Sequence, residues 1–224
     1  MIKLSDIKKT YRSGALVKTE NEVLKGISLD LSLGECVGII GDSGCGKSTL
    51  AKVIAGMIPA DSGTIELDGT EINYPYTKET RRQIQLIFQH PDVAMPPKLK
   101  IENSFKEVYK LLGKPYDTDK LLKYLEPYGI YEEHIGRYPA SLSGGELQRL
   151  CIARILLLEP KFIMLDEPTS MLDTISQGQI IRMLKDILSD RDVGFMFITH
   201  DLSLAEVICD RIFKMENGVL IQIQ

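Results

Sequence analysis

The sequence is poor in cysteine, in long apolar runs and in excess positive charge, and each shortage excludes a class of protein. Its four cysteines are Cys36, Cys45, Cys151 and Cys209; they form no C-x-x-C pair and lie at no zinc-binding distance from a histidine along the chain. We therefore expect reduced thiols in a cytosolic protein. With 27 basic and 31 acidic residues, the net charge of −4 argues against a general nucleic-acid binder.

No stretch of the chain approaches the roughly 18 apolar residues that a membrane-spanning helix needs. The first residues, MIKLSDIKKTY, also lack the apolar segment of a secretory signal peptide. We therefore expect any role at a membrane to need partner chains that supply the membrane-spanning part. The 224 residues, 44 % of them hydrophobic, suffice for one large domain or two small ones with a real core.

A glycine-rich segment is the feature around which the rest of the chain can be placed. It consists of Gly41, Asp42, Ser43, Gly44, Cys45, Gly46, Lys47, Ser48 and Thr49, and it fits the phosphate-binding P-loop pattern G-x-x-x-x-G-K-[ST]. An apolar run at 36–40 predicts a buried parallel strand before it, and the spacing in 48–57 predicts a helix after it. This context disfavours a chance match. We expect Lys47 to reach the β- and γ-phosphates of a nucleotide and the Ser48 hydroxyl to hold Mg²⁺.

Apolar patterns elsewhere predict an α/β fold with a helical interruption. Strands are expected at 2–7, 23–31, 64–67, 84–88, 162–165, 194–198, 212–215 and 219–223, with a polar loop at 8–19. Helices are expected at 101–112, with Phe105, Val108, Leu111 and Leu112 on one face, and at 117–128, 144–158, 174–188 and 202–209. We therefore expect one domain over 1–224, with an α/β core at 1–89 and 159–224 and a helical subdomain at 90–158. His90 and His134 belong to no motif and are expected on the surface.

An acidic pair, Asp166 and Glu167, follows the apolar strand at 162–165. An acid at the carboxyl end of a buried strand lies at the crevice where open α/β sheets bind ligands, so Asp166 is expected to hold Mg²⁺ through water. Glu167 points in a different direction and is the candidate base for an attacking water. The alternative is that both acids only cap the turn at Pro168.

The segment LSGGE at 142–146, followed by Gln148 and Arg149, resembles the signature motif of the ATP-binding cassette (ABC) ATPases. The other family motifs occur in order: Tyr11 resembles the aromatic that stacks on adenine, Gln89 the Q-loop glutamine, 170–173 (SMLD) the D-loop, and His200 the switch histidine. The resemblance covers the whole chain. It implies a P-loop NTPase cassette with a mostly parallel core sheet, an antiparallel β-subdomain and an inserted helical subdomain.

The resemblance also implies that two cassettes pack head to tail, so that each signature binds the ATP held by the other P-loop. The residues that would do so are Ser143, Gly144, Gly145 and Glu146, at a helix start whose free N–H groups suit an anion. Asp173 would make a contact across the dimer, although it could instead, or as well, cap the following helix.

Three other implied roles have plainer alternatives. Gln89 would bind the metal and the attacking water and form the hinge to the helical subdomain, but it could be a polar strand end. His200 would contact the γ-phosphate, but it could be a turn residue that caps the next helix. Tyr11 could be an ordinary surface tyrosine.

Three further segments are similar to the peptide and nickel importer ATPases. They are Gln89-His90-Pro91 with Pro97, Tyr138-Pro139, and TISQGQI at 174–180. This resemblance implies a peripheral subunit at the cytoplasmic face of the membrane. Its partners would be a second ATPase subunit, identical or different, integral membrane permeases and, indirectly, an extracytoplasmic substrate-binding protein. The chain departs from the family at Glu146, where glutamine is commoner, and at Met95-Pro96.

Two other functions remain open on the sequence alone. ABC ATPases that act on ribosomes usually carry two cassettes and those that act on DNA insert a long coiled coil, whereas this chain has one cassette and an acidic balance. A cassette that only clamps ATP is disfavoured by the presence of Glu167 and His200. We therefore predict Mg²⁺-dependent ATP hydrolysis coupled to import of a peptide, nickel or a metal chelate, with no nucleic-acid partner.

Overall fold

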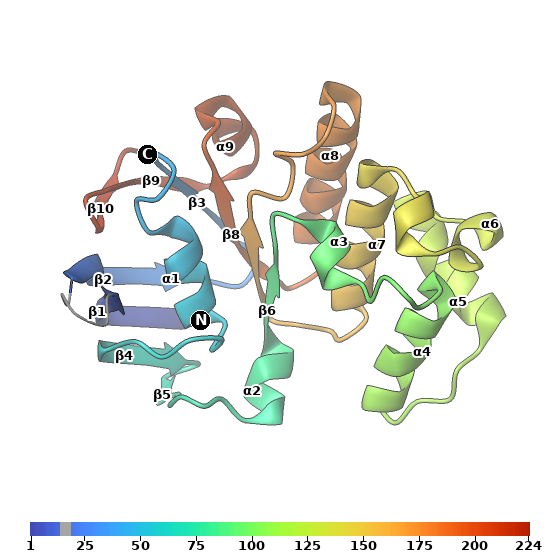
Figure 1. The fold of residues 1–224 in the computed structure, drawn as a ribbon, viewed down its shortest axis with the longest axis horizontal. Coiled ribbons are helices and arrows are strands. Elements are labelled where there is room, and N and C mark those ends of the chain that lie inside the picture. Colours follow the sequence, from blue (N-terminus) through green and yellow to red (C-terminus); the bar gives the residue numbers. More distant parts are fainter. Residues whose placement is uncertain (14–18) are drawn as a thin grey trace.

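The structure, a computed structural model, describes residues 1–13 and 19–224 (Figure 1). Within these residues, one sheet is antiparallel, in the order β2-β1-β4-β5, and its strands are β1 (Ile2–Ser13), β2 (Thr19–Leu31), β4 (Ser62–Leu67) and β5 (Thr70–Glu71). The other has the order β10-β9-β3-β8-β7-β6, and its strands are β3 (Cys36–Ile40), β6 (Ile84–Ile87), β7 (Phe162–Asp166), β8 (Gly194–Thr199), β9 (Arg211–Glu216) and β10 (Val219–Gln222). Its strands run parallel except for β10 at the edge.

The helices are α1 (Lys47–Ile54), α2 (Lys78–Gln83), α3 (Pro91–Ala94), α4 (Ile101–Leu111), α5 (Thr118–Leu125), α6 (Glu132–Ile135), α7 (Gly144–Leu156), α8 (Thr174–Asp190) and α9 (Leu202–Ile208), with 3-10 turns at Glu126–Tyr128 and Pro139–Ser141. Helices α4, α5 and α6 lie at the opposite end of the molecule from the antiparallel sheet (Figure 1). Among the described residues, no helix is long and apolar enough to cross a membrane.

The parallel sheet separates two apolar clusters. In β3, Cys36 and Ile40 belong to the cluster that includes α4, α5, α7, α8 and α9, whereas Val37 and Ile39 belong to the cluster that includes α1 and the antiparallel sheet. Strands β7 and β8 alternate in the same way, because successive side chains of a strand point to opposite faces. Every residue of β3, β7 and β8 is buried, which explains their continuous apolar sequences.

Most of the expected strands and helices are present, but the loop expected at 8–19 is wrong for its first part. Lys8 to Ser13 continues β1 and pairs with β2, so that Tyr11 lies opposite Asn21. Residues 14–18 lie outside the described part of the chain. The pairing register shifts between Lys9 and Thr10, and an irregular, polar ribbon shows little of the alternation that identifies a strand in a sequence.

Two expectations about burial are also wrong. Leu111 is 70 % exposed, although Phe105 and Val108 on the same helix are buried. Leu111 is the last residue of α4, and the segment that follows at 113–115 is exposed, so little of the protein covers that end of the helix. His134, expected on the surface, is only 7 % exposed, because its ring accepts a hydrogen bond from the Tyr131 backbone at the start of α6.

Candidate functional site

The P-loop connects the end of β3 to the first turn of α1, and two of its glycines are required by close contacts. Gly41 has a φ of +153°, and a Cβ there would lie 2.5 Å from the Met215 carbonyl oxygen. Gly46 has a φ of +119°, and a Cβ there would lie 2.9 Å from the Val23 carbonyl oxygen. The loop is therefore confined between β9 and β2, with the start of α1 directed at its concave side.

Lys47 lies inside this loop. It is only 5 % exposed, and its Nζ donates to the carbonyl oxygens of Gly41 at 2.7 Å and Asp42 at 2.8 Å. These contacts hold a positive charge where the loop's N–H groups and the helix dipole already favour an anion.

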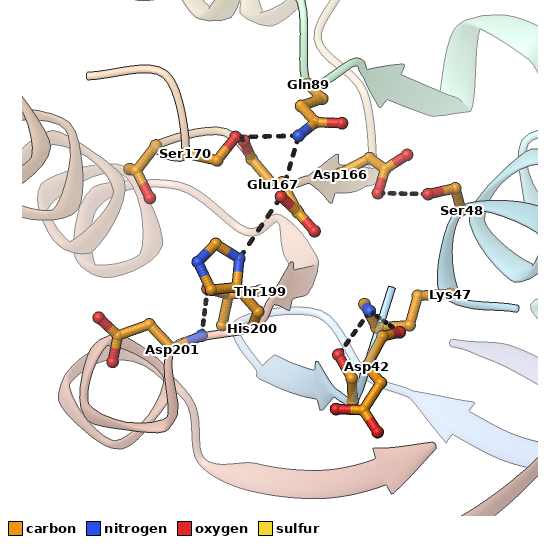
Figure 2. Close-up of polar contacts among 12 residues, drawn as sticks. Asp42, Lys47, Ser48, Gln89, Asp166, Glu167, Ser170, Thr199, His200 and Asp201 are labelled. Carbon is orange, nitrogen blue, oxygen red and sulfur yellow. Dashed lines mark hydrogen bonds and ion pairs between the residues drawn. The ribbon is translucent and has the colours of Figure 1, made fainter. Parts of the chain in front are cut away.

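Ser48 and Asp166, two of the three residues predicted to hold a metal, meet across the site. Ser48 Oγ donates to Asp166 Oδ1 at 3.0 Å (Figure 2). Burial at the end of β7 raises the pKa of Asp166, and the neighbouring Glu167 carboxylate raises it further. A buried carboxylate beside a second acid is stabilised by a cation, and a hydroxyl with a carboxylate is a ligand set that suits Mg²⁺.

Glu167 joins three segments of the chain. Its Oε2 accepts a hydrogen bond from Gln89 Nε2 at 3.0 Å, and His200 Nδ1 lies 3.5 Å away. Figure 2 shows these three side chains turned toward one another. The Glu167 backbone has a left-handed φ of +48°, so its side chain leaves the chain in a different direction from Asp166.

One cleft of about 830 Å³, which we call the P-loop cleft, is lined by these residues except Asp166, which contacts its wall through Ser48. Its lining residues are Val23, Ile40, Gly41, Asp42, Ser43, Gly44, Gly46, Lys47, Ser48, Thr49, Gln89, Glu167, Ser170, Met171, His200 and Lys214. The cleft therefore brings together four separate parts of the sequence: the P-loop, the Q-loop residue Gln89, the candidate base Glu167 and the switch residue His200. Cys45 instead lines a neighbouring hollow of about 530 Å³, beside the β9–β10 turn.

The predicted signature residues lie outside the P-loop cleft. Ser143 caps α7: its Oγ accepts the Glu146 N–H at 3.3 Å, and Glu146 Oε2 accepts the Ser143 N–H at 2.8 Å. Gly144 packs near Leu172 and Gly145 near Ser176, and a Cβ on either glycine would crowd these neighbours. The signature thus adjoins the D-loop of the same chain.

The positions of Asp173, His200 and Tyr11 bear on the alternative roles that the sequence left open for them. Asp173 accepts hydrogen bonds from Ile175 N and Ser176 N at 3.0 Å each, so it does cap α8. Helix α9 is capped by Asp201 rather than by His200. Tyr11 is 44 % exposed on β1 and does not line the P-loop cleft.

Several residues that line the cleft had no predicted role in it, among them Lys214 and Ser170, which the sequence placed only in the D-loop. Ser170 accepts a hydrogen bond from Gln89 Nε2 at 3.3 Å and donates to the Glu167 carbonyl oxygen at 3.1 Å. The position of Ser170, three residues after Glu167, is the feature of the sequence that could have indicated this contact. Lys214 reaches the cleft because β9 pairs in parallel with β3, opposite Ile40, and no local pattern reveals that register.

Comparison with known proteins decides the family. Residues 24–170 match the family model described as ABC transporter. The chain belongs to the ABC transporter family. Two curated relatives of this ABC cassette are similar over much of their length. The nickel import ATP-binding protein NikE of Escherichia coli is 35 % identical, and the match covers all of this chain and 87 % of the relative. The oligopeptide transport ATP-binding protein OppF of Haemophilus influenzae is 37 % identical over 88 % of this chain and 61 % of the relative.

Among solved structures, a dimeric ATP-binding cassette in a post-hydrolysis state with bound ADP and Pi has a TM-score of 0.86. It is 28 % identical, and the match covers all of this chain and 98 % of that one. The predicted α/β cassette fold, the resemblance to the peptide and nickel importer branch, and ATP hydrolysis as the activity are thereby confirmed. This cassette is an ATP-binding ATPase of the ABC type.

Proposed function

We propose that this cassette hydrolyses ATP to drive uptake of nickel, a metal chelate or a peptide through partner membrane permeases. The observation that carries the proposal is the position of Glu167, whose carboxylate lies in the P-loop cleft between Gln89 and His200. An acid so placed can act on a water beside the terminal phosphate, whereas an ATP clamp would not need it. The names of the relatives support the choice of cargo.

The P-loop and the start of α1 bind the phosphates in this mechanism. Backbone N–H groups of the loop surround the β-phosphate, and Lys47 neutralises the charge of the β- and γ-phosphates. Ser48, Asp166 and Gln89 are the residues that would hold Mg²⁺, which when bound would neutralise phosphate charge during transfer. Tyr11, which lies on β1 outside the lining of the cleft, stacks on the adenine in this proposal.

Glu167 takes a proton from the attacking water as its oxygen bonds to the γ-phosphorus and the bond from that phosphorus to the ADP oxygen breaks. Gln89 orients this water through its contact with Glu167, and His200 donates to the γ-phosphate. ADP and phosphate are the products, and the proton is released from Glu167 to solvent. The contacts among the three side chains support this division of roles.

The second half of each site comes from another cassette, either a copy of this chain or a sister subunit. Ser143, Gly144, Gly145 and Glu146 bind the partner's ATP at the α7 start, and Asp173 contacts the partner across the interface. Gly144 and Gly145 supply the N–H groups for this contact, because those of Ser143 and Glu146 bond to each other's side chains. The dimeric state of the similar solved cassette supports this arrangement. The pair docks on integral membrane permeases at the cytoplasmic face of the membrane, and an extracytoplasmic binding protein delivers the cargo.

The function is tested with Glu167→Gln, which removes the base but keeps the size and polarity of the side chain. We expect phosphate release to fall by about 10²–10⁴-fold, as loss of a general base generally causes. Light scattering should show an ATP-dependent dimer, because the bound nucleotide is no longer consumed. The matched control is Glu206→Gln, on the exposed side of α9, which should behave as the wild type.

A Glu167→Gln protein that still releases phosphate at the wild-type rate would contradict the assigned mechanism. Transport is tested separately, by placing the cassette with its permeases in vesicles and following radiolabelled nickel and labelled peptides. If neither cargo were taken up in the presence of ATP, and the cassette bound ribosomes or DNA instead, a non-transport ABC ATPase would be favoured.

A further inference from the structure

A buried histidine contacts the acidic residue of the signature. His134 lies on α6, its side chain is 9 % exposed, and its Nε2 lies 3.4 Å from Glu146 Oε1. The two residues are twelve positions apart in the sequence, and the fold brings α6 against the start of α7. No motif of the family predicted this contact.

The contacts of His134 favour the tautomer in which its Nε2 donates to the carboxylate. Nδ1 lies 3.0 Å from the Tyr131 backbone nitrogen and 3.3 Å from the Tyr131 carbonyl oxygen. The shorter contact and the carboxylate facing Nε2 both favour the neutral tautomer whose proton sits on Nε2 and points to Glu146. The other carboxylate oxygen, Oε2, accepts the Ser143 N–H at 2.8 Å. Both oxygens of Glu146 therefore have partners within the same chain.

These contacts matter because of where the carboxylate lies. Glu146 occupies the first turn of α7, next to N–H groups suited to a phosphate, and a free carboxylate there would repel the phosphates of ATP. The Ser143 N–H bond and the contact with His134 lower the pKa of Glu146, so it is ionised at neutral pH. The glutamine that is commoner at this position carries no charge and would need no such partner.

We propose that His134 is a positioning residue that holds Glu146 away from the partner's ATP and keeps Ser143 directed toward it. This inference rests on the proposed dimeric function. Without His134, the carboxylate is free to turn toward the phosphates, and the Ser143–Glu146 capping pair becomes less ordered. The need for the histidine therefore comes from the charge of Glu146.

The test is a double-mutant cycle in which His134→Leu is made in the wild type and in the Glu146→Gln protein. KM for ATP, kcat and ATP-dependent dimer formation are measured in all four proteins. We expect His134→Leu to raise KM by about tenfold in the wild type and by less than about twofold in the Glu146→Gln background, because the coupling requires the carboxylate. Equal effects in both backgrounds, or no effect in either, would overturn the proposal.

Two further variants separate positioning from stability. His134→Gln retains an amide donor for Glu146, so it should restore most of the loss in KM. Ile135→Val removes one buried methyl group from the same helix without touching the pair, so it should lower thermal stability but leave KM unchanged. If Ile135→Val raised KM as much as His134→Leu, the effect would belong to α6 packing and the proposal would be wrong.

Amide hydrogen exchange of residues 141–147 provides a readout that needs no turnover. Exchange there should be faster in His134→Leu than in the wild type, and the double variant should lie close to Glu146→Gln alone. A wild-type protein that neither hydrolyses ATP nor forms an ATP-dependent dimer would overturn the proposed function and this inference with it. A wild type active in both assays, with no coupling in the cycle, would overturn this inference alone.

Discussion

At the scale of single residues, Asp166 serves the site at a cost to the folded protein. Its carboxylate is buried at the end of β7, accepts a hydrogen bond from Ser48 and adjoins Glu167. Burial raises its pKa above the value of an unfolded chain, so the folded state holds the proton more tightly than the unfolded state does. Ionisation of Asp166 therefore destabilises the fold when no cation is bound.

We expect Asp166→Asn to abolish hydrolysis and, without nucleotide, to raise the thermal midpoint near neutral pH by roughly 2–4 °C. Because the folded-state pKa is raised, the wild type loses stability as pH rises from the ordinary carboxyl value through the raised value. The difference in midpoint between variant and wild type should therefore shrink as pH falls through that interval. Calorimetry of both proteins across pH measures it, and a difference that does not change with pH would contradict the account.

At the scale of elements, the position of a site residue is best predicted where its motif is one contiguous segment at the end of a strand or the start of a helix. The P-loop, the acidic end of β7 and the start of α7 each lie within one short segment, so their spacing indicates their geometry. The contact of His134 with Glu146 depends on how two helices pack, and Lys214 enters the cleft through strand register. Neither contact can be inferred from local spacing. The strand at 8–13 was not predicted because its residues show no alternation of polar and apolar side chains.

Helix α4 offers a matched pair that tests its buried face. Phe105 is fully buried and Leu111 is 70 % exposed on the same helix. We expect Phe105→Ala to lower the free energy of unfolding by about 3–5 kcal/mol, through lost burial and the cavity left behind. Leu111→Ala should change it by less than about 0.5 kcal/mol, because that side chain is mostly in water. Urea titrations of both variants measure the difference, and similar losses would contradict the observed face.

At the scale of the whole molecule, the two apolar clusters share the strands of one sheet. Residues 36, 40, 163 and 165 contribute to one cluster and residues 37, 39, 162 and 164 to the other. Unfolding of the shared parallel sheet would therefore expose the side chains of both clusters to water. This holds although α4 to α6 extend far from the antiparallel sheet (Figure 1). The helical segment is thus joined to the core through packing as well as through the chain.

We therefore expect a single cooperative thermal transition for the isolated cassette, in spite of its size. Scanning calorimetry should give equal van't Hoff and calorimetric enthalpies, and ATP should move the one transition to higher temperature. Two separated transitions, of which ATP shifted only one, would show that the helical segment and the core unfold independently.

The distribution of thiols has a consequence for inhibitor chemistry. Cys36, Cys151 and Cys209 are buried, whereas Cys45 is partly exposed in the wall of the hollow beside the β9–β10 turn, with its sulfur 3.9 Å from Lys47 Nζ. An electrophile shaped for that hollow would meet one reachable sulfur, in the loop predicted to hold the phosphates. Alkylating this thiol should block ATP hydrolysis, and bound ATP should protect it, so a covalent inhibitor of this cassette need not resemble a nucleotide but must reach the loop before ATP does. Full activity after complete modification of Cys45 would contradict this.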